Sequence, residues 1–112
     1  MAGVNKMDMR DEWIVALRAW AAKNDCVLEL WLFGSRTAGT SRPESDIDIA
    51  VALMPPTGKQ DWALAAFVES FDAWKSQLRA AVEWDVSLVA IGPSFEMDTI
   101  VRTTGIRLWR RG

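Results

Sequence analysis

The feature that most constrains this chain is the segment 32–51, in which one apolar run ends in a sharp turn and a second apolar run opens with two acids. The first run ends at Gly34-Ser35, and the second begins with Asp46 and Asp48, one residue apart. Side chains along a β-strand alternate between its two faces, so both aspartates share one face while the neighbouring isoleucines point into a core. The segment therefore predicts two apolar strands, a turn between them, and a pair of acids at the start of the second strand.

These two ends of the segment suit different parts of one ligand. Two like charges side by side on an apolar strand are costly unless something balances them, and carboxylate oxygens are the ligands that magnesium prefers. A strand that turns at Gly34-Ser35 into a helix leaves backbone N–H groups free at the helix start, which is where phosphate binds. Gly34 allows close approach of a phosphate, and Ser35 adds a hydroxyl donor. The segment predicts a site for a magnesium–nucleoside triphosphate.

Length and composition limit the alternatives. With 112 residues the chain is expected to form a single domain, 1–112, without room for a separate acceptor-binding domain. A net charge of −2 gives no overall attraction to nucleic acid, and the absence of histidine removes histidine-based nucleophile systems and histidine-ligated zinc. No apolar stretch approaches the roughly 18–20 residues of a membrane span, and the N-terminus lacks an apolar signal core. We therefore expect a cytoplasmic protein with no membrane partner.

The order of hydrophobic patterns predicts an α+β protein of two layers, with long amphipathic helices covering a small mixed sheet on one side. The expected elements are a helix over Met9–Lys23, a strand over Val27–Phe33, a helical turn at Ser35–Ala38, a strand over Asp46–Leu53, a helix over Trp62–Ala81, a strand over Glu83–Ile91, a helix over Phe95–Thr103 and a strand over Ile106–Trp109.

Tryptophan is unusually frequent, with seven in the chain, whereas tyrosine is absent. Trp13, Trp20 and Trp84 fall on the inferred core faces of their elements, which favours packing. Trp62 and Trp109 do not clearly do so, and each is open to a second interpretation as an exposed anchor at a protein interface.

A third acid, Asp85, stands in the otherwise apolar strand expected over Glu83–Ile91. If this strand lies beside the one that begins at Asp46, Asp85 joins Asp46 and Asp48 on one face. Three carboxylates there could bind two magnesium ions, one at the attacking hydroxyl and one at the triphosphate. Glu83 lies two residues away on the same expected face and is the rival for the third carboxylate.

The pattern Gly34-Ser35, ten residues, Asp46-Ile47-Asp48 resembles the Gly-Ser-x10-Asp-x-Asp motif of the DNA polymerase β-like nucleotidyltransferase superfamily. The surrounding residues are most similar to its small, stand-alone MNT-type members, and the ending Gly105–Trp109 resembles the final strand of the family. One departure is that Ala38-Gly39-Thr40 replaces the Arg-Gly that many members have after Gly-Ser-Arg. The resemblance implies the nucleotidyltransferase fold over most of the chain.

The resemblance also implies roles for individual residues. Gly34 and Ser35 would hold the nucleotide, Asp46 and Asp48 would bind the metals, and Asp85 would complete the two-metal site and help deprotonate the acceptor hydroxyl. Arg36 directly follows the turn, and its two interpretations are a contact to a phosphate of the nucleotide and an ordinary solvated loop arginine.

The function implied by the resemblance is transfer of a nucleoside monophosphate, AMP from ATP, onto a hydroxyl of another molecule. MNT-type proteins are commonly antitoxins that modify a tyrosine of a HEPN-family toxin, so a HEPN-type protein partner is the leading expectation. The alternatives are a transferase for a small molecule such as an aminoglycoside, with its site completed by a homodimer, and a non-catalytic module that neutralises a partner by contact alone.

Overall fold

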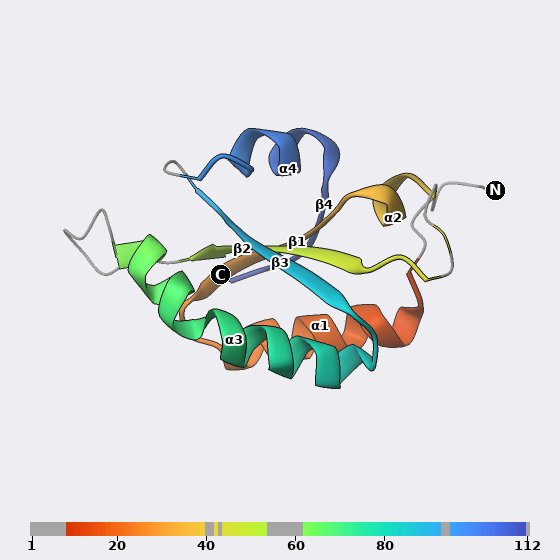
Figure 1. Cartoon of the computed structure of the whole chain (residues 1–112), viewed down its shortest axis with the longest axis horizontal. Coiled ribbons are helices and arrows are strands. Elements are labelled where there is room, and N and C mark those ends of the chain that lie inside the picture. The colour runs from red at the N-terminus through yellow and green to blue at the C-terminus, as the bar shows by residue number, and fades with distance from the viewer. Residues whose placement is uncertain (1–8, 40–41, 43, 54–61, 93–94, 112) are drawn as a thin grey trace.

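The computed structural model describes residues 9–39, 42, 44–53, 62–92 and 95–111 (Figure 1). Each expected element is present, with ends that differ by a few residues from the sequence prediction. The elements are α1 (Asp11–Lys23), β1 (Val27–Phe33), α2 (Ser35–Ala38), β2 (Ile47–Leu53), α3 (Trp62–Val82), β3 (Val86–Ile91), α4 (Asp98–Thr104) and β4 (Ile106–Arg110).

The four strands form one mixed sheet in the order β3-β2-β1-β4. β1 pairs antiparallel with β2 and with β4, whereas β2 and β3 run parallel. The register places Phe33 opposite Asp48 and Asp48 opposite Ser87, so one row across three strands holds the end of β1, the second aspartate and a serine of β3. β3 therefore lies beside β2, which is the condition for Asp85 to approach the two aspartates. The candidate site is built at this row, near the starts of β2 and β3.

The two long helices, α1 and α3, lie side by side over one face of the sheet (Figure 1). Their apolar stripes meet the inward side chains of the strands in one core, in which Leu17, Leu30, Ile49 and Leu78 are fully buried. A side chain of this kind contributes about 1.5–3 kcal/mol when it leaves water. The burial of Trp13 and Trp20 in this core confirms their expected packing, and Trp84 and Trp109 are half-buried against it.

The short helix α4 lies over the opposite face of the sheet (Figure 1). Val101 of α4 packs there against Ala50, Ala52 and Ile91, the continuation of the face that carries Asp46 and Asp48. The sequence predicted that helices cover the sheet on one side only. This is correct for α1 and α3, but α4 covers part of the opposite face. The small alanines allow α4 to approach the sheet, while the end of this face that carries the aspartates lies beyond α4 and beside α2.

Two expectations from the sequence concern the side chain of Trp62 and the absence of a membrane span. The side chain of Trp62 lies outside the described residues, so the proposed anchor there is not described. Among the helices of the described ranges, none combines the length and apolar character needed to cross a membrane.

Candidate active site

The turn between β1 and α2 depends on a glycine for two reasons. Gly34 has φ 79° and ψ −160°, a backbone region that is essentially restricted to glycine. A Cβ atom at this position would also collide with the carboxylate of Asp48 on the neighbouring strand. The Gly34 carbonyl accepts hydrogen bonds from the backbone N–H (3.1 Å) and hydroxyl (2.6 Å) of Thr37, which close the turn. The backbone of the Gly-Ser turn therefore lies directly against the second aspartate.

Asp46 directly precedes β2, which begins one residue later than the sequence predicted, and Asp48 is the second residue of the strand. Ser87 of β3 donates a hydrogen bond from its hydroxyl to Oδ2 of Asp46, at 3.1 Å. Burial raises the pKa of the Asp48 carboxyl above its ordinary value, and the negative charge of Asp46 raises it further. The nearby Ser87 hydroxyl and the positive charge of Arg36 offset part of this increase in the pKa.

This pair has the chemistry of a magnesium site. Its donors are all oxygen, the two carboxylates repel each other, and burial of Asp48 increases the cost of that repulsion. A divalent cation bound by them would reduce both the repulsion between the two carboxylates and the cost of burying the charge of Asp48. The close contact of Gly34 with Asp48 places backbone N–H groups of the turn next to the same carboxylates, where a metal-bound phosphate can be held. The residues present therefore fit a magnesium nucleotide.

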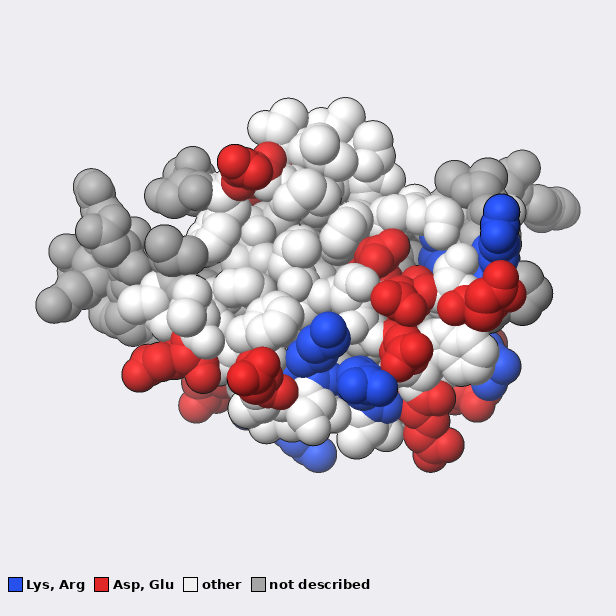
Figure 2. Space-filling model, in the orientation of Figure 1, with Lys and Arg blue, Asp and Glu red and all other residues white. Residues whose placement is uncertain are grey.

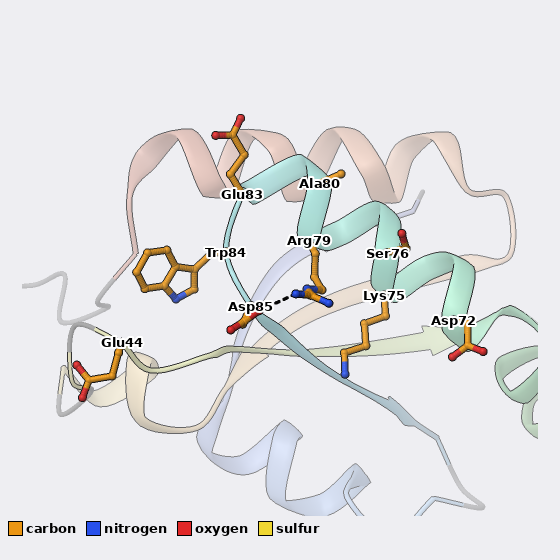
Figure 3. A pocket seen from close by; sticks show the side chains of 9 residues that line it. All are labelled: Glu44, Asp72, Lys75, Ser76, Arg79, Ala80, Glu83, Trp84 and Asp85. Carbon is orange, nitrogen blue, oxygen red and sulfur yellow. Dashed lines mark hydrogen bonds and ion pairs between the residues drawn. The ribbon is translucent and has the colours of Figure 1, made fainter.

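Asp85 reaches the site with its backbone but not with its carboxylate. Its carbonyl accepts a hydrogen bond from the backbone N–H of Ile47, at 2.9 Å, so it lies beside the start of β2. Its side chain is two-thirds exposed and forms an ion pair with Nη2 of Arg79 on α3, at 2.9 Å (Figure 3). Among the residues that the structure describes, no three acidic, histidine or cysteine side chains lie close enough to hold a metal ion by themselves.

The expected position of Glu83 was wrong. The third strand begins at Val86 rather than Glu83, because α3 continues to Val82 and Glu83 ends it with a positive φ of 55°. The backbone N–H of Glu83 still donates to the carbonyl of Arg79, at 2.7 Å, which belongs to the helix end. Strand alternation consequently does not apply to Glu83, and its side chain points away from Asp85 in the close view (Figure 3).

The side chain of Arg36 is buried, and a carbonyl nine residues later in the chain holds its guanidinium group. Only 5% of Arg36 is exposed, and its Nε and Nη2 donate to the carbonyl of Ser45 at 3.3 and 2.7 Å. The same carbonyl accepts a hydrogen bond from Nε1 of Trp84, at 2.8 Å. The interpretation of Arg36 as a solvated loop residue was therefore wrong. The contact between Trp84 and Ser45 was not indicated by the sequence pattern, although Trp84 stands directly before Asp85 and Ser45 directly before Asp46.

An open groove of about 810 Å³ runs between α3 and the start of β3 and ends at Asp85 (Figure 3). It is lined by Glu44, Asp72, Lys75, Ser76, Arg79, Ala80, Glu83, Trp84 and Asp85. Acidic side chains surround a small basic patch on this face of the molecule (Figure 2). The groove thus borders the candidate site from the side of the edge strand β3.

The comparison with protein families identifies the class. The family model described as polymerase beta nucleotidyltransferase matches residues 16–104. Because this match includes the Gly-Ser turn, all three aspartates and most of the chain, the protein belongs to the polymerase beta nucleotidyltransferase family. Among curated proteins, none matches the chain.

Solved structures similar to this chain include chains of toxin–antitoxin complexes. A chain of a toxin–antitoxin complex with AMP-PNP is 27% identical, with a TM-score of 0.62, covering 88% of this chain and 73% of that one. A chain of the MntA–HepT toxin–antitoxin is 22% identical, with a TM-score of 0.61 and coverages of 91% and 74%. A third match is a chain of a complex between a tri-AMPylated HEPN toxin of Shewanella oneidensis and an MNT antitoxin. It is 23% identical, with a TM-score of 0.60, covering 92% of this chain and 74% of that one. The last two likenesses bear on the fold alone.

Proposed function

We propose that this protein transfers AMP from magnesium-ATP onto a hydroxyl of a HEPN-type toxin and so acts as its antitoxin. The observation that carries the proposal is the contact of the Gly34 turn with Asp48, which joins a phosphate turn to a carboxylate pair in a chain of the nucleotidyltransferase family. The likeness to a toxin–antitoxin complex with AMP-PNP supports adenine as the base and a toxin as the acceptor.

The residues have separate tasks in this reaction. The backbone at Gly34-Ser35 and the Ser35 hydroxyl would hold the triphosphate. Asp46 and Asp48 would hold the magnesium ions, which supply charge neutralisation at the phosphates and a lower pKa of the acceptor hydroxyl when bound. Ser87 keeps the Asp46 carboxylate in place through its hydrogen bond. These residues position the nucleotide so that little reorganisation is needed during transfer.

The bond changes balance without a further reactant. The acceptor oxygen forms a bond to the α-phosphorus, the bond from this phosphorus to the oxygen bridging the α- and β-phosphates breaks, and pyrophosphate leaves. The acceptor proton passes to the carboxylate of Asp85, which must exchange its ion pair with Arg79 for the acceptor. That ion pair is exposed at both partners, so its loss costs about 0–1 kcal/mol and does not prevent the exchange.

The test is labelling of the partner. The purified protein is incubated with magnesium, each of the four labelled nucleoside triphosphates in turn, and a HEPN-type toxin as the candidate partner. The expected result is stable label from ATP on the partner, located on a hydroxyl side chain by mass spectrometry. Label on a small-molecule acceptor instead would support the aminoglycoside-type alternative. Neutralisation of the partner by an Asp46→Asn variant, with no label on either, would support binding without catalysis.

A further inference from the structure

The carbonyl oxygen of Ser45 is shared by side chains from two distant segments. Arg36 of α2 donates to it from Nη2 at 2.7 Å and Nε at 3.3 Å, and Trp84, which precedes β3, donates from Nε1 at 2.8 Å. The other polar atoms of Ser45 are bonded as well. Its N–H donates to the Arg42 carbonyl at 3.0 Å, and its hydroxyl accepts from the Arg42 N–H at 2.9 Å. Ser45 is therefore fixed at its backbone and at its side chain.

The groups that hold this carbonyl are packed in an aromatic and cationic cluster. Trp13 of α1 is 4% exposed, and its ring centroid lies 5.7 Å from that of Trp84, at an interplanar angle of 40°. The guanidinium carbons of Arg36 and Arg10 lie 5.1 and 4.8 Å from the Trp13 ring. Trp13 and Arg36 are buried, so their contact restricts both side chains, and hydrogen bonds from a charged guanidinium are among the stronger ones.

Each segment that meets at Ser45 carries one candidate site residue next to the contact. Arg36 directly follows Ser35 of the phosphate turn, Ser45 directly precedes Asp46, and Trp84 directly precedes Asp85. The sheet pairing fixes β1, β2 and β3 farther along, and one backbone bond, from the Ile47 N–H to the Asp85 carbonyl at 2.9 Å, joins the starts of β2 and β3. The shared carbonyl adds a contact that also includes the segment of the phosphate turn.

We propose that the Ser45 carbonyl is a hub that sets the relative positions of Ser35, Asp46 and Asp85, with Trp84 and Arg36 as positioning residues. The proposal rests on the proposed function in assigning those three residues to nucleotidyl transfer. Trp84 is the informative member, because it links the edge strand to the hub through a single N–H. Trp84→Phe keeps a ring against Trp13 and removes only the donor and part of the indole.

A matched control exists in the same core. Trp20 on α1 donates from Nε1 to Oε1 of Gln77 at 2.8 Å and packs edge-on against Trp74, with ring centroids 5.8 Å apart. Trp20→Phe therefore removes a more deeply buried indole and one hydrogen bond of the same length, but away from Ser45. The two variants are compared with the unaltered protein by thermal unfolding, to establish that both remain folded.

The first measurement does not depend on activity. Backbone amide NMR spectra of the isolated protein are expected to show that Trp84→Phe shifts the signals of Asp46 and Thr37, on the two segments across the hub, whereas Trp20→Phe leaves them in place. Shifts confined to the neighbours of position 84 along the chain would overturn the hub. This outcome is independent of whether the protein transfers AMP, so it separates failure of the hub from failure of the proposed function.

The second measurement uses metal alone and then the reaction. Loss of one neutral hydrogen bond predicts about three- to tenfold weaker binding of Mn²⁺ by calorimetry in Trp84→Phe and unchanged binding in Trp20→Phe. In the transfer assay, Trp84→Phe should lower kcat with little change in KM for the partner. Equal Mn²⁺ affinity and equal kcat in the two variants would overturn the positioning role, whereas an unaltered protein that transfers no AMP would overturn the proposed function alone.

Discussion

Replacement of Gly34 by alanine tests the close contact between the backbone of the phosphate turn and the carboxylate of Asp48. The backbone at φ 79° and ψ −160° costs a residue with a Cβ about 1–3 kcal/mol. The new Cβ would also overlap the Asp48 carboxylate, with the carboxyl carbon only 3.0 Å away. Because the Asp48 side chain is short and can rotate, it should turn away and relieve the overlap. We therefore expect Gly34→Ala to lose about 1–3 kcal/mol of unfolding free energy and most of its Mn²⁺ affinity.

Urea denaturation and Mn²⁺ calorimetry measure these two effects separately. Gly39→Ala is the control, because Gly39 ends α2 in an ordinary left-handed conformation, with φ 72° and ψ 23°. It should cost about 1–2 kcal/mol and leave Mn²⁺ binding intact. Repeating Gly34→Ala in an Asp48→Ala background removes the overlap with the carboxylate and leaves the backbone strain. A Gly34→Ala protein with full stability and full Mn²⁺ affinity would refute the reasoning.

Three further predictions follow from the same contacts. In the absence of metal, Asp48→Asn should be more stable than the unaltered protein at neutral pH. The folded-state pKa of Asp48 is raised, so ionisation of this carboxyl reduces the stability of the folded protein as the pH rises through the range just above the ordinary aspartate pKa. Urea denaturation at pH 3 to 7 should therefore show that the stability advantage of Asp48→Asn over the unaltered protein grows with pH. Arg79→Gln releases the Asp85 carboxylate from its ion pair, so calorimetry should show tighter Mn²⁺ binding; weaker binding would instead mean that Arg79 supports the site. Gly105→Ala places a Cβ 2.5 Å from the Val101 carbonyl and 2.8 Å from that of Leu32, and since backbone cannot easily yield, thermal unfolding should show a loss of about 1–3 kcal/mol.

The local parts of the site could be predicted from the sequence. The turn at Gly34 and the shared face of Asp46 and Asp48 follow from a change of apolar run to turn and from the period of two along a strand. The sequence left the neighbour of β3 open, and pairing with β2 was only a condition for Asp85 to approach the aspartates; the structure has this pairing. The turn and the aspartate pair depend on residues close together in the chain.

The remaining features depend on packing between distant segments. The burial of Arg36 requires a carbonyl acceptor nine residues later and the ring of Trp13 from another helix. The start of β3 was placed three residues too early, because Glu83 adopts a left-handed conformation that is uncommon for a residue with a side chain and is not indicated by the sequence pattern. Asp85 consequently precedes the strand, and its carboxylate pairs with Arg79 near the end of α3.

The central claim is that Asp46 and Asp48 carry out nucleotidyl transfer. The most direct test is the mass of the HEPN-type partner after incubation with magnesium-ATP and this protein, either unaltered or as Asp46→Asn, Asp48→Asn or the exposed control Asp25→Asn. We expect added AMP with the unaltered protein and with Asp25→Asn, and none with either site variant. Added AMP in both site variants, at the level of the control, would contradict it.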